Sequence, residues 1–230
     1  MRMTIVDVVI PAYNEEEAIP LVLADIPKEK VRSIYVVDNN STDQTAQKAQ
    51  TAGATVLSEN HQGYGSACLR GLAEIKSKNP KPDVIVFLDA DYSDYPEELD
   101  LLLKPIQEER AELVIGSRAL GNREKGAMLP QQVFGNWLAT TMMRWMYRSE
   151  FTDLGPFRAI TWRALEQIQM ADQDFGWTVE MQVKVLKNKI LYTEVPVSYR
   201  KRKGISKITG TIRGTIMAGY KIIFTILRYA

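Results

Sequence analysis

Short apolar segments recur along the first half of the chain, separated by helical patterns. Four of them are rich in Val, Ile and Leu and lack regular polar alternation, which is typical of parallel strands covered on both faces. These segments are Ile5–Ile10, Ser33–Val37, Thr55–Leu57 and Val84–Leu88. Leu113–Ser117 is expected to be a further strand of the same sheet.

Helical patterns lie between these strands, at residues 15–26, 41–53, 65–78 and 96–109. The first opens with acids, which the helix dipole favours, and the last opens with Pro96, which suits a first helical turn. Regular alternation of strands and helices is typical of an α/β fold. We therefore expect a single doubly wound, mostly parallel, Rossmann-like sheet.

The pattern changes in the second half of the chain. Residues 123–132 are polar and predict a loop, residues 134–147 predict a helix rich in Met and aromatic residues, and Ile190–Val197 predicts a strand. No linker composition divides the chain. We expect one domain, residues 1–209, followed by an amphipathic C-terminal helix, residues 210–230.

The C-terminal segment has an apolar face bordered by basic residues. Residues on the apolar face at helical spacing are Ile212, Ile216, Tyr220, Ile223 and Leu227, and the basic residues are Arg213, Lys221 and Arg228. This pattern suits a helix that lies on an anionic membrane surface. A helix packed on its own domain, or on a second subunit in a homodimer, would have the same pattern.

Composition excludes several classes of protein. The 29 basic and 28 acidic residues nearly cancel, which argues against a nucleic-acid-binding protein. A single cysteine, Cys68, and a single histidine, His61, exclude an intrachain disulfide and the usual Cys/His zinc site. One unpaired cysteine suits a reducing compartment, so we expect a cytoplasmic protein. No run of about 18 apolar residues predicts a membrane-spanning helix.

Unusual polar residues follow four of the predicted strands, in the segments PAYNEEE, DNNSTD, ENHQGYG and DADYSD. Doubly wound sheets bind ligands at the carboxyl ends of their strands, where these segments should meet. Asp89 and Asp91 point the same way along an extended backbone and repel each other unless a cation is near. Carboxylate oxygens suit Mg²⁺ or Mn²⁺, which commonly bridge to substrate phosphates.

Four segments carry a resemblance to a known family: VVIPAYNEEEAIPLVL, VVDNNSTDQT, NHQGYGSACLRGL and VIVFLDADYSDYPEEL. In order and spacing they are similar to the family 2 glycosyltransferases of the GT-A fold, and to the dolichol-phosphate mannosyltransferases and other polyprenyl-phosphate glycosyltransferases among them. The resemblance implies a metal-dependent, inverting transfer of a hexose. The donor would be a nucleotide sugar of the GDP-mannose or UDP-glucose type, and the acceptor a polyprenyl or dolichyl phosphate at the cytoplasmic face of a membrane.

The resemblance also implies roles for residues on the donor side. Asp89 and Asp91 match the family's metal- and diphosphate-binding pair, and Ser93 stands where relatives often carry a further metal ligand, Gln, so that Asp94 is an alternative ligand. Tyr64 stands where many relatives have Lys. The residues implied in nucleotide-sugar binding are Pro11, Tyr13, Glu15, Asp38, Asn40, Gly63 and Asp89. Asn39 and Asn40 replace an acid and a glycine, and Asn tolerates a positive φ.

On the acceptor side, FTDLGPFRAI and YRKRKGISK resemble segments that border the family's acceptor pocket, with Pro156 in place of Gly. The residues implied in binding the acceptor phosphate are Arg118, Arg158, Arg202 and Lys207. A phosphate monoester is largely ionised at neutral pH and can attack without a base. Asp153 is the candidate if a base is needed, or it holds Arg158 or a turn.

Other hypotheses remain at this point. The chain could glycosylate a soluble acceptor, with the C-terminal helix serving packing or dimerisation. It could also be a non-catalytic protein that binds nucleotide sugars, although the acids and arginines weigh against this. A nucleotidyltransferase is a further alternative, but its first strand should lead into a glycine-rich loop, and PAYNEEE contains no glycine.

Overall fold

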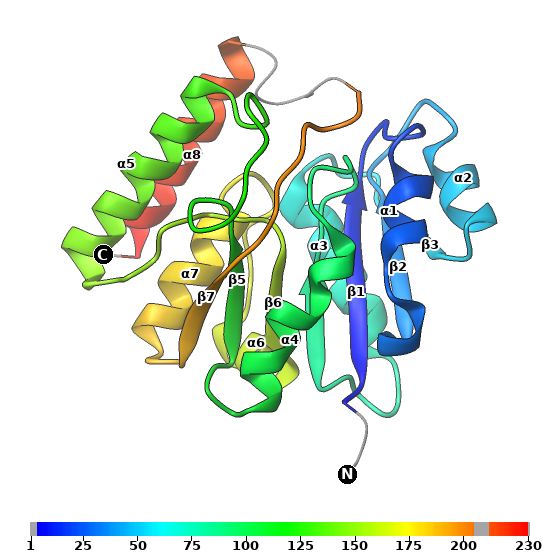
Figure 1. The fold of residues 1–230 in the computed structure, drawn as a ribbon, viewed down its shortest axis with the longest axis horizontal. Helices are drawn as coiled ribbons and strands as arrows, with labels where there is room; N and C mark the ends of the chain where they lie inside the picture. Colours follow the sequence, from blue (N-terminus) through cyan, green and yellow to red (C-terminus); the bar gives the residue numbers. More distant parts are fainter. Residues whose placement is uncertain (1–3, 205–211, 230) are drawn as a thin grey trace.

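The computed structural model describes residues 4–204 and 212–229. Within them a seven-stranded sheet carries helices on both faces (Figure 1). The strands are β1 (Val6–Ala12), β2 (Ser33–Asp38), β3 (Thr55–Ser58), β4 (Val84–Phe87), β5 (Leu113–Ser117), β6 (Arg158–Thr161) and β7 (Tyr192–Pro196). The α-helices are α1 (Ile19–Asp25), α2 (Thr45–Thr51), α3 (Tyr64–Lys76), α4 (Leu99–Gln107), α5 (Pro130–Tyr147), α6 (Trp162–Ile168), α7 (Trp177–Lys187) and α8 (Ile212–Arg228). Short 3-10 turns lie at Lys28–Lys30 and Pro96–Glu98.

The strand order is β3-β2-β1-β4-β6-β5-β7. Only β6, among the described strands, runs antiparallel to its neighbours, β4 and β5. The expected α/β fold with a mostly parallel sheet is confirmed. Sequence reasoning missed β6, α6 and α7. The strand β6 is hard to predict because it is short and opens with the charged residue Arg158.

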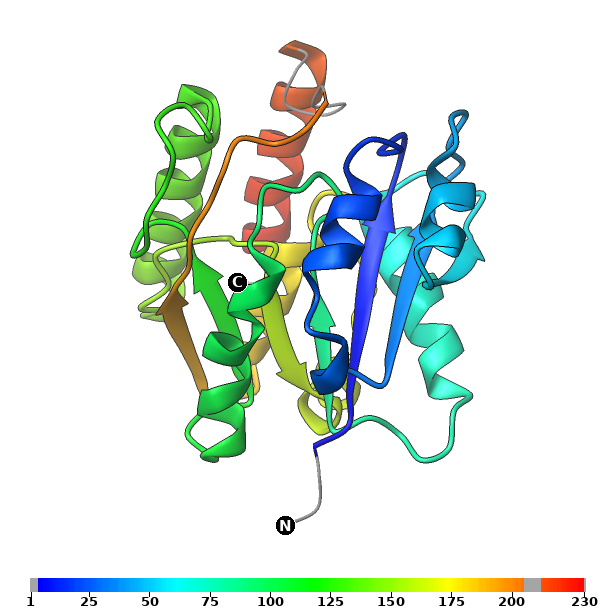
Figure 2. The same cartoon turned by 45° about the vertical axis from the view of Figure 1, so that its right-hand side comes forward.

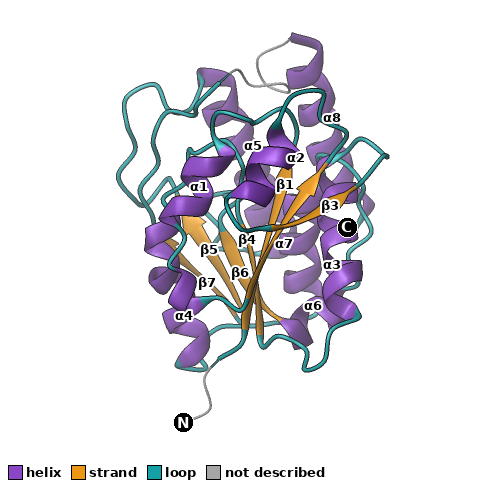
Figure 3. Ribbon diagram, turned by 90° about the vertical axis from the view of Figure 1, so that its right-hand side faces the viewer, coloured by secondary structure: helices purple, strands orange, loops and turns teal. Residues whose placement is uncertain are grey.

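Alternation along each strand divides the core into two layers. Val9 and Phe87 pack on the face covered by α3, α6 and α7, whereas Val8 and Val86 pack on the face covered by α1 and α4. Figure 3 shows the sheet between these two helical layers. Helices cover both faces of the sheet, so successive residues of the strands are apolar and do not alternate with polar residues.

The C-terminal helix α8 packs against α5 and α7, at one edge of the molecule (Figures 1 and 2). Thr225 and Ile226 are buried there, and the Tyr147 hydroxyl donates a hydrogen bond of 2.7 Å to the Ile226 carbonyl. The helix α5 begins at Pro130, earlier than the expected residue 134, because proline fits a first helical turn. None of the helices, over the residues described, combines the length and apolar character needed to cross a bilayer.

The carboxyl ends of β1, β2 and β4 lie at the edge of the sheet opposite the N-terminus, and we call this edge the rim (Figure 1). The segment that follows β7 crosses above the sheet towards the rim (Figures 1 and 2). Its backbone is fixed there, because the Arg200 amide donates to the Ser93 carbonyl and the Lys203 amide donates to the Asp91 carbonyl, both at 2.9 Å. Residues distant in sequence therefore meet at one site.

Candidate active site

A cavity of about 410 Å³ opens at the rim. Segments from six parts of the chain form its walls. The lining residues are Pro11, Ala12, Tyr13, Glu15, Asn39, Gln62, Gly63, Tyr64, Asp89, Ala90, Asp91, Asp174, Phe175 and Arg202. The structure thus brings together most of the residues expected on the donor side and one expected on the acceptor side.

The acidic pair lies at the end of β4. The Tyr64 hydroxyl donates a hydrogen bond of 3.1 Å to Asp89 Oδ1. Burial and the neighbouring charge of Asp91 raise the pKa of Asp89 to about 6. Asp91 Oδ1 accepts hydrogen bonds from the Ser93 amide (3.0 Å) and hydroxyl (2.5 Å). The hydroxyl of Ser93 is therefore bonded to Asp91 in this structure.

Asp94 is the third carboxylate of this region. It is 2% exposed, and neither of its carboxylate oxygens has a hydrogen-bond partner among the residues that the structure describes. Burial, together with the charges of Asp89 and Asp91, raises the pKa of Asp94 well above its usual range. A buried carboxylate without a partner is costly unless it meets a cation or takes up a proton.

Arg202 also lines the cavity, beside the acidic pair. Its guanidinium is 2.5 Å from Glu15 Oε1 and 3.1 Å from Asp91 Oδ2. Arg200, two residues earlier, fixes this segment, because its guanidinium stacks over the Tyr92 ring at 3.3 Å and donates to the Tyr92 carbonyl at 2.8 Å. Sequence reasoning gave Arg200 no role, although Arg200 lies in the segment YRKRKGISK that was expected to border the acceptor.

Arg118 and Asp153 form a buried two-point ion pair. Arg118 Nε is 2.9 Å from Asp153 Oδ2, and Arg118 Nη2 is 2.7 Å from Asp153 Oδ1. Glu194 supports the pair by accepting a hydrogen bond of 3.1 Å from the Asp153 amide. The Arg118 guanidinium also lies 5.0 Å from the centre of the Tyr199 ring. Both oxygens of Asp153 thus hold Arg118, which fixes the direction of its remaining donors.

Arg118 and Arg158 do not line the cavity. Arg158 is fully buried, and its guanidinium donates to the carbonyls of Leu154, Gly155 and Thr178 at 2.5–3.1 Å. Arg158 therefore links β6 to α7, and its buried guanidinium cannot contact an acceptor. Lys207 lies outside the described residues.

On the nucleotide side, Pro11, Tyr13, Glu15 and Gly63 line the cavity. Asp38 and Asn40 do not line it. Asn40 is exposed with φ 68°, so the predicted tolerance of Asn for this turn is confirmed.

Asn39 lines the cavity instead, and its side chain binds the Gly63 amide at 2.8 Å and the carbonyls of Glu59 and His61 at 3.0 and 2.9 Å. Asp174 and Phe175 were also missed. No motif marks the segment that contains them, and only the fold places it at the rim.

Comparisons with known proteins agree with this geometry. Residues 7–169 match the family described as Glycosyl transferase family 2. An uncharacterized glycosyltransferase of Mycobacterium tuberculosis is 35% identical over 221 residues, covering 93% of this chain and 94% of that protein. The undecaprenyl-phosphate mannosyltransferase of Micrococcus luteus is 30% identical over 218 residues, covering 90% and 88%.

Among solved structures, glucosyl-3-phosphoglycerate synthase of Mycobacterium tuberculosis, in complex with Mn²⁺, uridine diphosphate and phosphoglyceric acid, superposes with a TM-score of 0.78. The match covers 99% of this chain and 78% of that one at 22% identity, which establishes a shared fold. The family match covers more than half of the chain, and two relatives of at least 30% identity cover nearly all of it. The chain belongs to glycosyl transferase family 2 and is a glycosyltransferase.

Proposed function

We propose that this glycosyltransferase moves a hexose from a nucleotide sugar to the phosphate of a polyprenyl or dolichyl phosphate. One observation carries the proposal: Arg202, from the segment expected to border the acceptor, contacts Asp91, from the pair expected to bind the donor diphosphate, at 3.1 Å. Donor and acceptor groups would therefore meet at one end of the cavity. The full-length similarity to an undecaprenyl-phosphate mannosyltransferase supports a lipid phosphate as the acceptor.

On the donor side, the nucleoside would lie along the ends of β1 and β2, against Pro11, Tyr13 and Asn39. Its diphosphate would reach Asp89 and Asp91. Donors of the GDP-mannose or UDP-glucose type fit a cavity of about 410 Å³, which is within the usual size range of small-molecule sites.

A divalent cation, Mg²⁺ or Mn²⁺, suits the acidic pair of this site, although the described residues contain no preformed group of three or more Asp, Glu, His or Cys side chains that could hold a metal. Asp89 and Asp91 would hold it together with the donor diphosphate, and Asp94 or Ser93 are the further ligands that the sequence suggests. The buried carboxylate of Asp94 has no hydrogen-bond partner among the described residues, and its oxygens are of the kind that such ions prefer. When bound, the ion would stabilise the charge of the departing nucleoside diphosphate.

The acceptor needs little chemical activation. A phosphate monoester has a second pKa of about 6 and is largely ionised at neutral pH. Its oxygen would attack the anomeric carbon while the bond from that carbon to the diphosphate oxygen breaks, giving inversion. Arg118 and Arg202 would position the phosphate by charge-assisted hydrogen bonds. Asp153, whose oxygens both bind Arg118, would orient that arginine and need not act as a base.

A peripheral position on the cytoplasmic face of a membrane is part of this proposal. Large apolar side chains on α5 and α8 are exposed to solvent, namely Val133, Phe134, Trp137, Trp145, Met217, Tyr220, Phe224 and Leu227. Aromatic residues favour the interface between lipid and water. Arg228, which is exposed, would add attraction to anionic lipids, whereas Lys221 is paired with Asp172. Both helices begin at the end of the molecule that carries the rim (Figure 1).

A soluble phosphorylated acceptor is the second candidate. The neighbour in fold was solved with phosphoglyceric acid, which is a soluble phosphate ester. In addition, α8 buries Ile226 against its own domain, so its apolar face has a packing role without any membrane. The same arginines would bind either phosphate.

One assay separates the candidates. The protein is incubated with Mn²⁺, a panel of nucleotide sugars, and either a short-chain polyprenyl phosphate or 3-phosphoglycerate, and the release of nucleoside diphosphate is measured. We expect release that depends on the polyprenyl phosphate with one class of donor. Release with 3-phosphoglycerate alone would favour the soluble acceptor. Absence of acceptor-dependent release with every donor would contradict the proposed function.

A further inference from the structure

We propose that Asp174 binds a hydroxyl group of the donor's hexose, and that the C-terminal helix α8 holds the loop which presents it. This inference rests on the proposed function only in taking a nucleotide sugar as the donor. It assigns a specificity-determining residue that no sequence motif marks, and it gives α8 a role at the active site.

Asp174 and the neighbouring Phe175 line the cavity, on the loop between α6 and α7. The Asp174 carboxylate has no hydrogen-bond or ion-pair partner among the residues that the structure describes, although Asp174 is partly buried. Its backbone is fixed, because its amide donates a hydrogen bond of 2.7 Å to Asp172 Oδ1. Asp174 therefore lines the donor cavity with a fixed backbone and a carboxylate to which no described residue is bonded.

The chemistry of a carboxylate limits its partner. An ionised carboxylate only accepts hydrogen bonds, and it repels a diphosphate. At Asp89 and Asp91 a bound cation would allow a diphosphate to approach. Among the described residues no basic side chain pairs with Asp174, so Asp174 would repel a diphosphate. The matching donor group for Asp174 is a neutral hydroxyl, and a hexose carries several of these.

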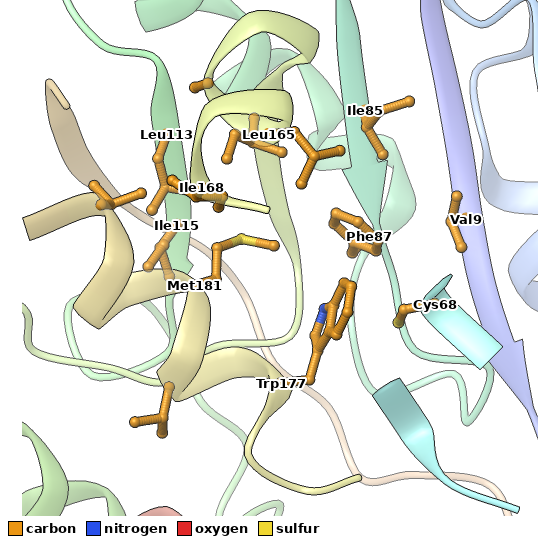
Figure 4. Packing of buried hydrophobic residues seen from close by; sticks show 14 of the residues in the cluster. Val9, Cys68, Ile85, Phe87, Leu113, Ile115, Leu165, Ile168, Trp177 and Met181 are labelled. Atoms are coloured by element: carbon orange, nitrogen blue, oxygen red, sulfur yellow. The ribbon is translucent and has the colours of Figure 1, made fainter. Parts of the chain in front are cut away.

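The position of the loop points to the hexose rather than to the nucleoside. The loop leads directly into α7, whose first residue, Trp177, packs edge-on against Phe87 of β4 with 5.7 Å between ring centres (Figure 4). The residues expected to bind the nucleoside, Pro11, Tyr13 and Asn39, follow β1 and β2. The loop also packs against Gly63, which is expected on the nucleotide side, but it continues beside Tyr64, whose hydroxyl bonds Asp89 at the diphosphate end of the cavity. A donor that runs from Pro11 and Tyr13 past Asp89 would place its sugar towards α7.

The loop is locked against α3. A Cβ atom on Gly63 would lie 2.1 Å from the Gln173 carbonyl oxygen, and one on Gly65 would lie 2.0 Å from the Asp172 carbonyl oxygen. The Ser66 amide also donates to the Gln173 carbonyl at 2.9 Å. This close backbone approach requires glycine at both positions, and it holds the loop beside Tyr64, the residue that bonds Asp89.

The helix α8 fixes the other side of the loop. Lys221 Nζ lies 3.1 Å from Asp172 Oδ2, while Asp172 Oδ1 accepts hydrogen bonds from the amides of Asp174 and Gly176. One carboxylate thus links α8 to the backbone that carries Asp174.

A second link runs through Glu180. Its carboxylate accepts hydrogen bonds from the Ala171 and Asp172 amides, at 3.1 and 2.7 Å, and from the Tyr229 hydroxyl at 2.9 Å. The loop is therefore linked to α8 through Lys221 and, by way of Glu180 on α7, to Tyr229, the residue that follows α8.

The first test compares Asp174→Ala with Asp174→Asn. Affinities for Mn²⁺ with a nucleoside diphosphate, and for Mn²⁺ with the intact nucleotide sugar, are measured by calorimetry. Loss of a hydrogen bond to a charged group corresponds to about tenfold or more in affinity. We expect Asp174→Ala to bind the nucleotide sugar about tenfold more weakly and the nucleoside diphosphate unchanged, with Asp174→Asn in between because its amide oxygen still accepts.

Two results would overturn the assignment. Equal losses for the nucleoside diphosphate and the nucleotide sugar would place Asp174 at the nucleoside, and unchanged affinity for both would leave it no role in binding. If the wild-type protein binds a nucleotide sugar while Asp174→Ala is unchanged, this inference fails alone. If the wild-type protein binds none, the proposed function fails.

The second test concerns α8. Asp172→Asn keeps the oxygen that binds the loop amides but loses the charge that pairs with Lys221, and Lys221→Met removes the partner. We expect both variants to weaken nucleotide-sugar binding by a similar factor, with the double variant no weaker than either single one. Lys78→Met is the matched control, because Lys78 Nζ lies 2.7 Å from Glu74 Oε1 in a similarly exposed ion pair near the end of α3 and has no bond to the loop.

The melting temperature of each variant separates positioning from folding. We expect the control to lose as much thermal stability as Lys221→Met and to keep the wild-type affinity. If Lys78→Met weakens sugar binding equally, or if Lys221→Met does not weaken it, α8 does not position Asp174.

Discussion

Arg202 Nη1 lies 3.1 Å from Asp91 Oδ2, so a cation from near the end of the chain is paired with the carboxylate expected to bind the metal. The other oxygen of Asp91 is bonded to Ser93. Arg202 thus offsets part of the negative charge at Asp91, and its guanidinium also pairs with Glu15. If a metal ion takes the place of Arg202 at Asp91, as we propose, the donors that face Asp91 can instead hold an acceptor phosphate.

Replacing Arg202 should therefore affect two steps in opposite directions. In Arg202→Ala, Asp91 Oδ2 has no competing cation, and we expect the affinity for Mn²⁺ without nucleotide to rise several-fold. The same change should raise the acceptor KM, because a charge-assisted contact to its phosphate is lost. Mn²⁺ binding is measured by electron paramagnetic resonance, and acceptor kinetics by diphosphate release. Weaker Mn²⁺ binding in the variant would show that Arg202 does not compete for Asp91.

Asp91→Asn preserves the shape of the side chain and removes its charge. Metal stabilisation of a leaving group contributes several kcal/mol, and a loss of about 3 kcal/mol corresponds to about 100-fold in kcat. We expect at least this loss at saturating Mg²⁺ in a coupled diphosphate assay. Asp100→Asn, at an exposed acid on α4, is the control. Near-normal turnover by the Asp91 variant would refute the role of the acidic pair.

Arg118 and Asp153 should behave as a unit on the acceptor side. Arg118→Ala is expected to raise the acceptor KM or lower kcat while the nucleoside diphosphate affinity stays within about twofold. Asp153→Asn should produce the same pattern, since only the orientation of Arg118 is lost. A large loss of nucleotide affinity in calorimetry would instead move Arg118 to the donor phosphates. A loss in Asp153→Asn much greater than in Arg118→Ala would favour Asp153 as a base.

The packing of α8 changes what truncation should do. If the C-terminal helix only lay on a membrane, a chain without it should stay folded. In the structure Thr225 and Ile226 are buried, and full burial of one isoleucine side chain is worth about 1.5–3 kcal/mol. We now expect truncation before residue 212 to lower the free energy of unfolding by several kcal/mol in urea titrations. An unchanged urea midpoint would mean that α8 contributes little to the core.

Membrane binding is better tested by exposed residues than by truncation. The double change Trp137→Gln and Phe224→Gln removes two exposed aromatic side chains, one from α5 and one from α8. We expect reduced co-sedimentation with anionic vesicles and an unchanged melting temperature. Wild-type binding should weaken but persist at high salt, since salt screens only the contribution of basic residues. Lack of wild-type binding at either salt concentration would favour the soluble acceptor.

Glu180 provides a pH test of the contact between α8 and the loop. Burial raises the pKa of its carboxyl group, but hydrogen bonds from Lys184 and the Asp172 and Ala171 amides outweigh it, so the pKa is lowered overall. Glutamate in an unfolded chain has a pKa of about 4.3. Because the folded pKa is lower, ionised Glu180 stabilises the fold above this value, and the contribution is lost as the pH falls through the folded pKa.

The free-energy difference between wild type and Glu180→Gln should therefore be larger at pH 7 than near pH 3.5, in urea titrations. Glu166→Gln, at an exposed position on α6, is the control, for which we expect little difference at either pH. A constant difference for Glu180→Gln would mean that its charge does not stabilise the fold.

The sequence by itself determined the sheet and much of the donor side. Apolar segments such as Val84–Phe87 identify buried strands because both faces of the sheet are covered, and the polar residues that follow them must meet at one edge. Asp89, Asp91, Tyr13 and Gly63 are local features of strand ends. Their place at the cavity follows from connectivity, which the strand and helix pattern already contains.

Only the tertiary structure decided which other side chains reach that edge. Arg158 and Arg202 are both arginines in segments expected to border the acceptor. In the structure Arg158 is buried in the interior, whereas the segment after β7 brings Arg202 to Asp91. Asp174 has no motif, and it reaches the cavity because α7 packs on β4 and because Gly63 and Gly65 allow close backbone contact. Contacts between distant segments depend on packing volume and on the pairing of buried charges, which local sequence patterns do not record.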